Sequence, residues 1–335
     1  MLVLTAQHLA TATAIPRQYV HKAAQSEVLL TGWNALGDDS FRIAAQWPRA
    51  HSYYGVSDGR HDPMLLVETV RQAVPLVSHL GYDVPFGHRQ IWEHLSWTVD
   101  ADALSCAMVP AEIELRVRCG EVTRRAGRLA ALRMDIELTR DGAPLGTAST
   151  RFTNQAPKLY ARLRGRYADL ERAIAGCVPL APPASARRVG RTGFADVVLS
   201  PSDRAHRFQL RVDLGHPVLF DHPVDHAPGM LLLEAARQAA HEALHPHPVR
   251  VTGMESAFHR YVELDAPCWV ESEVLGVRPE GTAVRVTASQ HGHEVFTATV
   301  TATVTAAGSA AGSAAGSVTG TAAGTAAATP TGGEA

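Results

Sequence analysis

The sequence predicts an α+β fold in which one unit occurs twice, each unit an antiparallel sheet wrapped around a central apolar helix. Nearly the same peptide begins at Met64 and at Met230, and it places Glu68 and Glu234 at corresponding positions. Each copy is followed by segments with the alternating polarity of β-strands. A chain of 335 residues is also long enough for two such domains. These observations favour a tandem (double) hot-dog architecture that forms an internal pseudo-dimer.

In the first half, a continuous apolar stretch over Met64–Leu80 predicts a buried helix. We expect Gly81 to end it as the C-cap. The turns Arg125-Ala126-Gly127 and Asp141-Gly142 divide the later strands into a meander. The expected strands are Glu27–Leu30, Phe41–Gln46, Arg89–Thr98, Ile113–Arg124, Arg128–Arg140 and Pro144–Phe152.

The second half repeats this order around a helix that we expect from Gly229 to about Leu244. Its turns are Glu280-Gly281 and His291-Gly292. Its expected strands are Ala195–Ser200, Arg207–Val212, Val249–Phe258, Cys268–Val277, Thr282–Gln290 and Glu294–Val304. The predicted domains are an N-terminal hot-dog over 1–157, a connecting helix and proline-rich linker over 158–190, a C-terminal hot-dog over 191–306, and a disordered Gly/Ser/Ala/Thr tail over 307–335.

Composition argues against several classes of function. A formal net charge of −2 gives no electrostatic basis for binding nucleic acid or an anionic membrane, and no apolar run approaches the roughly 18 residues that span a bilayer. Four cysteines without a C-x-x-C pair indicate reduced thiols. The opening residues lack the basic region of a signal peptide, so we expect a cytoplasmic protein. Lys22 and Lys158 are the only lysines, and neither is close in sequence to the repeated peptide, so Schiff-base chemistry is not indicated.

Each repeated helix carries a glutamate and an arginine three residues apart, Glu68 with Arg71 and Glu234 with Arg237. This spacing puts both side chains on one helical face, and charges inside an apolar helix are costly unless they are paired or used. One interpretation is a structural ion pair that locks the helix. The other is a pair of equivalent pockets, each with a carboxylate poised as a general base and an arginine for a phosphate or enolate oxygen. We expect Glu68, Glu234 and Arg237 to be catalytic, and Arg71 and Gln238 to bind substrate.

The segment Phe220–Gly229 contains two prolines and a glycine directly before the second helix. A helix N-terminus offers free backbone N–H groups and a positive dipole, so a thioester carbonyl placed there would find an oxyanion site. Gly229 would let the carbonyl come close. The alternative is an ordinary N-capping turn. His222 and His226 could act as bases or be hydrogen-bonded scaffolding of this loop. We regard both as supporting residues and expect His222 to contact substrate.

A zinc-protease pattern also occurs, in His241-Glu242-Ala243-Leu244-His245. Pro246 disfavours helical conformation at His245, and no third ligand is evident, so we interpret the match as chance. The sequence has no Gly-rich phosphate loop, Rossmann fingerprint or G-x-S-x-G elbow. We therefore expect neither a metal nor a cofactor.

Two families resemble the chain at these residues. Pro228-Gly229 and Glu234 are similar to hot-dog acyl-thioester enzymes, including fatty-acid dehydratases, although the position of their catalytic histidine falls on Phe220 here and on Tyr54 in the first half. The closer resemblance, over about residues 20 to 305, is to the AfsA-type A-factor (γ-butyrolactone) biosynthesis family of actinomycetes. It is carried by Val20-His21-Lys22, Glu27-Val28-Leu29-Leu30-Thr31-Gly32-Trp33, the run from His216 to His226, Pro228-Gly229-Met230 and the run from Glu234 to Ala239.

The AfsA resemblance implies an acyltransferase. A β-ketoacyl group would pass from an acyl carrier protein or coenzyme A thioester to the hydroxyl of dihydroxyacetone phosphate. The ester would close to a butenolide phosphate, the precursor of a γ-butyrolactone, butenolide or furan signal that regulates secondary metabolism. The resemblance places Glu68, Glu234 and Arg237 at the family's functional positions, with Arg71 as the symmetric partner.

Alternatives on the same scaffold are a dehydratase, a thioesterase or a non-catalytic acyl-ligand sensor, the last disfavoured by the lack of a DNA-binding motif. The sequence leaves open the acyl chain, the carrier, a homodimer, and whether the first half is degenerate, because Arg60-His61-Asp62-Pro63 has no Pro-Gly.

Overall fold

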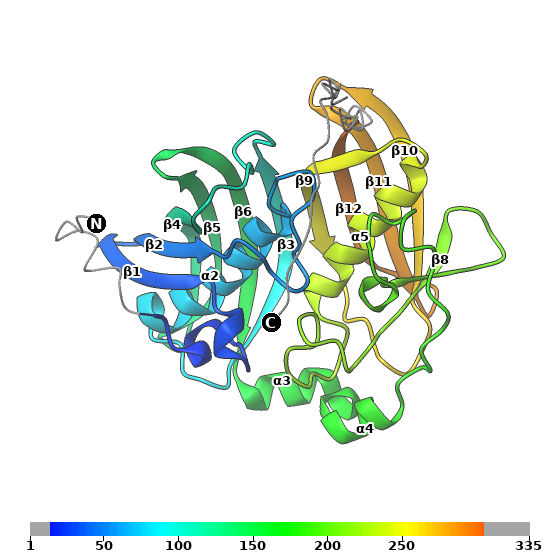
Figure 1. Ribbon diagram of the computed structural model, residues 1–335. Coiled ribbons are helices and arrows are strands. Elements are labelled where there is room, and N and C mark those ends of the chain that lie inside the picture. Colours follow the sequence, from blue (N-terminus) through cyan, green and yellow to red (C-terminus); the bar gives the residue numbers. More distant parts are fainter. Residues whose placement is uncertain (1–13, 305–335) are drawn as a thin grey trace, which may run out of the picture. The chain divides into compact units, whose positions relative to one another are not determined.

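The fold is a tandem hot-dog, as predicted: each half of the chain forms an antiparallel sheet that curves around one long helix (Figure 1). It is seen in a computed structural model, which describes residues 14–304. The predicted tail, 307–335, lies outside the described residues. The first half contains β1 (Leu30–Gly37), β2 (Ser40–Trp47), α2 (Met64–Tyr82), β3 (Arg89–Val99), β4 (Ala111–Arg125), β5 (Arg128–Arg140) and β6 (Ala143–Gln155). The second half contains β7 (Leu199–Pro201), β8 (Arg207–Leu210), α5 (Gly229–Leu244), β9 (Val249–Phe258), β10 (Trp269–Arg278), β11 (Gly281–Gln290) and β12 (His293–Val304).

The two half-sheets join into one sheet of twelve strands, in the order β1-β2-β4-β5-β6-β3-β9-β12-β11-β10-β8-β7. Both halves have the same internal order, so the joined sheet has an approximate two-fold axis at its centre. The junction is an antiparallel pairing of β3 with β9, which runs from His94 opposite Ala257 to Thr98 opposite Gly253. Because of this symmetry, the start of each helix meets residues of the other half: an added Cβ on Gly229 of α5 would touch Trp92 of β3, and Asp62, just before α2, contacts Arg237 of α5.

Both central helices are buried on almost every side, as their apolar sequences predict. Helix α5 has the expected bounds, whereas α2 continues past Gly81 to Tyr82 and is closed by Asp83 in the left-handed conformation. The C-cap prediction for Gly81 was therefore wrong. This residue is a glycine because the ring of Phe41 lies against it, 2.6 Å from where a Cβ would be.

The first strand of each half begins later than predicted. Gln25–Glu27 and Phe194–Asp196 form single 3₁₀ turns (η2 and η4) ahead of β1 and β7. A glutamine of the adjacent central helix binds the backbone of the last residue of each turn and of the residue two positions further on, and these bonds fix the start of the strand. The pairs are Gln72 with Glu27 and Leu29, and Gln238 with Asp196 and Val198.

The chain between the halves is helical, but in two pieces rather than one. Helix α3 (Pro157–Arg164) and helix α4 (Leu170–Ala175) are separated by a 3₁₀ turn, η3 (Gly165–Ala168), that starts at a glycine with φ of 55°. Figure 1 shows both helices below the ends of the half-sheets. No helix within residues 14–304 is long and apolar enough to cross a membrane.

Candidate active site

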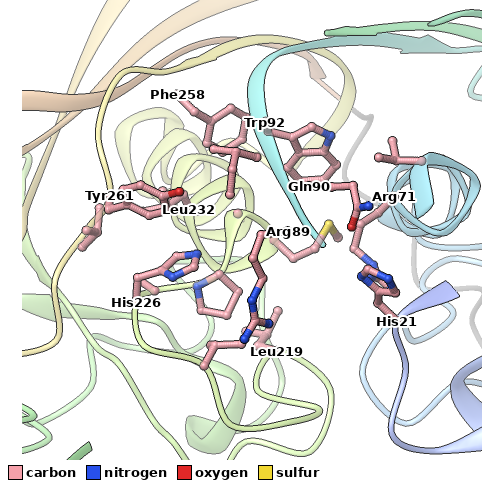
Figure 2. Close-up of a pocket in the computed structure, with 18 of the residues that line it drawn as sticks. His21, Arg71, Arg89, Gln90, Trp92, Leu219, His226, Leu232, Phe258 and Tyr261 are labelled. Atoms are coloured by element: carbon pink, nitrogen blue, oxygen red, sulfur yellow. The ribbon is translucent and has the colours of Figure 1, made fainter. Parts of the chain in front are cut away.

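A cavity of about 340 Å³ lies between the N-terminus of α5 and the middle of α2. This volume is within the usual range for small-molecule sites. Residues of both halves line it, as the pseudo-dimer requires. Four predicted site residues are among them: Glu68, Arg71, His222 and Gly229. In Figure 2, His226 and Tyr261 lie at one end of the cavity and His21 and Arg71 at the other, with Arg89 between them.

Glu68 is held at the wall of the cavity by three neighbours. Arg71 donates from Nε to both carboxylate oxygens, at 3.1 and 3.0 Å, and Gln72 donates at 2.8 Å. The third neighbour is Lys22, whose Nζ is 3.1 Å from the same carboxylate. Lys22 is distant from Glu68 in sequence, so local pattern does not predict their contact.

These contacts determine the protonation of Glu68. Burial by itself raises the pKa of the carboxyl group, but the charges of Arg71 and Lys22 and the hydrogen bonds from Arg71 and Gln72 outweigh burial and lower the pKa to about 2. That direction differs from the carboxylate poised near neutral pH that the sequence led us to expect. In the free protein, Glu68 is a stable anion that holds two cations in place.

Two arginines at the cavity retain unused hydrogen-bonding capacity. Arg71 uses Nε and Nη2 for Glu68 and for the carbonyl oxygen of Val20, which leaves Nη1 without a partner among the described residues. Arg89 forms no ion pair within residues 14–304 and only stacks over the ring of Tyr160, at 5.5 Å. Unpaired guanidinium groups at a cavity are well suited to bind a phosphate.

His21 lines the cavity beside Arg71 in the left-handed backbone conformation, with φ of 50°. Its Nε2 is 2.9 Å from Nε2 of His79, and Nδ1 of His79 is 2.6 Å from the carbonyl oxygen of Val84. The carbonyl must accept from His79 Nδ1–H, so Nε2 of a neutral His79 accepts from His21. Burial, His79 and Arg71 lower the pKa of His21 to about 3, which keeps this pair neutral.

The N-terminus of α5 opens onto the cavity without a cap. Pro228 precedes it in an extended conformation and supplies no side-chain cap, and the N–H groups of Gly229 and Met230 have no acceptor among the described residues. Gly229 is required by packing as well, because an added Cβ would lie 2.6 Å from the indole of Trp92. Two free amide donors at a helix N-terminus are chemically suited to bind an oxyanion.

His222 stands near this helix end, where its Nδ1 is 3.2 Å from Asp221. Asp221 also accepts from the backbone N–H of Ala23 at 2.7 Å, which ties the segment that carries His21 and Lys22 to the loop before α5. His222 is therefore held at the cavity by Asp221, which also connects the two halves of the chain.

In the second copy of the motif, the glutamate is enclosed by other side chains and does not reach the cavity. Glu234 has a side chain only 1% exposed, and Glu234, Arg237 and Gln238 do not line the cavity. Arg237 and Arg191 pair with Glu234 at 2.9 and 2.8 Å, and Arg237 also pairs with Asp62 at 3.0 Å. Burial raises the pKa of Glu234, but the two arginines and the donor Gln238 outweigh it and lower the pKa to about 2. The catalytic role predicted for Glu234 and Arg237 stays a prediction.

Corresponding positions explain why one copy is open and the other closed. Asp62 caps α2 by accepting from Met64 N–H at 2.8 Å, where the equivalent end of α5 is free. The ring of Tyr53 stacks at 4.0 Å on the guanidinium of Arg191, the arginine that pairs with Glu234. The two central helices are thus equivalent in fold and unequal in access.

The residues of the zinc-like pattern have separate partners. His241 packs its ring against Gly190, and Glu242 accepts from Nε of Arg188 at 2.8 Å. His245 follows the end of α5. Within residues 14–304, no group of three or more His, Cys, Asp or Glu residues is arranged to hold a metal ion.

Sequence reasoning missed Lys22, His21, Arg89 and Asp62. His21 and Lys22 lay in a segment that the resemblance had marked, and the charge of Lys22 was the available signal. Arg89 begins an ordinary amphipathic strand, and nothing in its pattern distinguishes it from the many surface arginines.

Comparisons with known proteins show the family of this chain. A family described as A-factor biosynthesis hotdog domain matches residues 4–155 and 175–306. A 2-oxo-3-(phosphooxy)propyl 3-oxoalkanoate synthase of Streptomyces virginiae is 43% identical over 290 residues, which cover 86% of this chain and 97% of that protein. A synthase of the same name from Streptomyces coelicolor is 40% identical, over 87% of this chain and 92% of that protein. Among solved structures, a putative oleoyl thioesterase from Lactobacillus plantarum is similar at a TM-score of 0.49 and 11% identity, over 81% of this chain and 99% of that one.

Proposed function

Because the chain belongs to the A-factor biosynthesis hotdog family, we propose that it transfers a β-ketoacyl group from a thioester to the hydroxyl of dihydroxyacetone phosphate. The product would be the 2-oxo-3-(phosphooxy)propyl 3-oxoalkanoate for which the Streptomyces relatives are named. We further propose that this ester closes to a butenolide phosphate, and that the reaction takes place in the cytoplasm. The proposal rests on one observation: the free N-terminus of α5 and a group of cations line the same cavity.

The cations explain how the protein would bind the phosphate of the acceptor. A phosphate dianion needs several charged donors to leave water, and Lys22, Arg71 and Arg89 all line the cavity. Glu68 keeps Arg71 and Lys22 oriented, because three hydrogen bonds and an ion pair fix their positions. We propose that the acceptor phosphate binds here through Nη1 of Arg71 and the guanidinium of Arg89.

The remaining wall accounts for the donor. The N–H groups of Gly229 and Met230 would stabilise the oxyanion that forms when the hydroxyl attacks the thioester carbonyl. Apolar side chains of Trp92, Phe258 and Leu232 line the same cavity and would bury the acyl chain (Figure 2). We propose acyl carrier protein or coenzyme A as the carrier.

The test is mass spectrometry of the products that the purified full-length protein forms from β-ketoacyl thioesters, with and without dihydroxyacetone phosphate. We expect an ester, and later its cyclised product, only when the acceptor is present. A free β-keto acid formed equally with and without acceptor would indicate a thioesterase and refute the proposal. An α,β-unsaturated acyl product would indicate a dehydratase.

A further inference from the structure

The proposed acyl transfer needs a base that takes the proton of the acceptor hydroxyl, and two of the candidates on the cavity wall are weak bases. The negative charge of Glu68 is balanced by Arg71 and Lys22, which lower the pKa of the carboxyl group to about 2. His21 has a pKa of about 3 because it is buried beside His79 and Arg71. Both would accept a proton poorly at neutral pH.

His226 differs from both in its surroundings. It lies on the cavity wall three residues before Gly229, so the imidazole and the free helix N-terminus belong to the same short loop. Its Nδ1 is 2.6 Å from Oδ1 of Asp225. Nε2 has no hydrogen-bond partner among the described residues, and 25% of the side chain is exposed. Figure 2 shows the ring at the cavity, beside Tyr261.

Asp225 is built to be a fixed anion. The hydroxyl of Tyr160 donates to its two oxygens at 2.7 and 2.8 Å, and the guanidinium of Arg164 lies 3.8 Å from Oδ2. Burial raises the pKa of Asp225, but His226, Tyr160 and Arg164 outweigh it and lower the pKa to about 2. An ionised carboxylate beside Nδ1 holds the proton on that nitrogen and leaves the Nε2 lone pair free.

The support for this pair comes from the segment between the two halves. Tyr160 and Arg164 belong to α3, and Arg164 is fixed by Glu263 at 2.8 Å and by the ring of Tyr261 at 4.0 Å. The ring of Tyr261 in turn meets the ring of His226 edge-on, with centroids 4.8 Å apart. The titratable and charged groups around His226 are Asp225 and Tyr261, with Tyr160 and Arg164 behind the carboxylate and Arg89 of β3 stacked over Tyr160 at the same cavity.

We propose that His226 is the general base of the acyl transfer, with Asp225 as its positioning residue. This inference rests on the proposed function and adds the residue that moves the proton. The corresponding loop of the first half, Arg60-His61-Asp62-Pro63, has its histidine before the aspartate, and that aspartate is bound to Met64 N–H and Arg237. The closed copy therefore has no such pair.

The proton and electron changes balance without any further reactant. Nε2 of His226 takes the proton as the hydroxyl oxygen forms a bond to the thioester carbon, and the carbonyl π electrons move to oxygen at the α5 N-terminus. The tetrahedral intermediate then collapses: the C–S bond breaks, and the thiolate leaves with the proton from His226. The ester and the free thiol are formed, and the imidazole is regenerated.

The test uses His226→Asn, whose amide reaches the position of Nδ1 and so keeps a donor to Asp225 while the basic Nε2 is removed. Ester formation is measured by mass spectrometry at saturating substrates over a range of pH, with Asp225→Asn as the second variant. His293→Gln, at an exposed position at the start of β12, is the matched histidine control.

We expect His226→Asn to lower kcat by about 10²-fold or more, the usual contribution of a general base, with little change in the KM for the acceptor. The His226→Asn protein should also lose the fall of kcat at low pH. Asp225→Asn should lower kcat and change the pH range over which that fall occurs. A His226→Asn protein that folds and keeps wild-type kcat would overturn the assignment, as would a profile unchanged in shape. A wild-type protein that forms no ester would overturn the proposed function and this inference together, whereas the first two outcomes overturn the inference alone.

Discussion

The two buried glutamates form a natural pair of test and control. In each, the pKa is lowered from 4.5 to about 2 by buried cations, and each side chain is almost fully covered. A fall of the pKa from 4.5 to about 2 corresponds to roughly 3 kcal/mol of stabilisation per glutamate at neutral pH. Breaking a buried ion pair from one side typically costs about 3–5 kcal/mol, which agrees. We therefore expect Glu68→Gln and Glu234→Gln to lower the free energy of unfolding by similar amounts at pH 7.

The sign of the pH dependence follows from the lowered pKa. The stabilisation is present above the ordinary pKa of a glutamate and is lost as the pH falls towards 2, because the folded carboxylate must then take up a proton. The difference between wild type and either variant should therefore shrink on acidification. Urea unfolding of all three proteins at pH 7 and at successively lower pH measures it. A difference that stayed constant over this range would refute the electrostatic origin.

Activity should separate the two variants, because only Glu68 borders the cavity. Glu68→Gln frees Arg71 and Lys22 to move, and loss of such positioning typically lowers turnover on the order of 10²-fold. Glu234→Gln should keep nearly normal turnover once rates are divided by the folded fraction, which circular dichroism measures. An equal loss in both variants, per folded molecule, would refute the open-and-closed reasoning and return Glu234 to the direct catalytic role that the sequence suggested.

Three more predictions follow from individual contacts. Arg71→Ala should raise the KM for dihydroxyacetone phosphate about tenfold or more, as the loss of a charged phosphate contact does, and leave the KM for the acyl donor nearly unchanged; equal rises in steady-state kinetics would contradict it. Gly229→Ala should destabilise the protein by about 1–3 kcal/mol, since its Cβ would lie 2.6 Å from Trp92, and thermal unfolding should show partial recovery on adding Trp92→Leu; a stable single variant would contradict it. Unfolding free energy should also begin to fall below about pH 6.5, because unfolded histidines then bind protons while His241 and His21, with pKa values of about 4 and about 3, stay neutral in the fold. In urea titrations His241→Gln should flatten that part of the curve, and an unchanged slope would count against buried neutral histidine as its cause.

Most of the architecture could be read from local pattern. The repeated peptide located both central helices, and the turns at Asp141-Gly142 and His291-Gly292 fixed the hairpins, where the structure has the left-handed conformations that these residues favour. The main error in the predicted helices concerned a single residue. Gly81 was taken for a helix end because a glycine late in a helix usually is one, whereas its small size is needed by the ring of Phe41, a contact between segments far apart in the sequence.

The candidate site was only half predictable. Glu68, Arg71, His222 and Gly229 were expected at a pocket and do line the cavity. The repeat also implied that Glu234 and Arg237 would line an equivalent one. The arginines of the second copy instead contact Asp62 and Tyr53, which come from the other half of the molecule. A repeated motif shows that two helices have similar sequences, but it does not show which side chains of other segments pack against each helix.

The sequence alone therefore determined the duplicated fold, the two charged helices and the kind of chemistry they suit, because these depend on residue type and on spacings within single segments. The tertiary structure decided which glutamate meets the cavity, that Lys22 and Arg71 share it, and that Asp225, itself bound by Tyr160 of α3, holds His226 at the cavity wall. Those outcomes depend on distances between segments that are remote along the chain. Ion pairing, burial and protonation change steeply over a few ångströms, so they are settled only when the two halves pack.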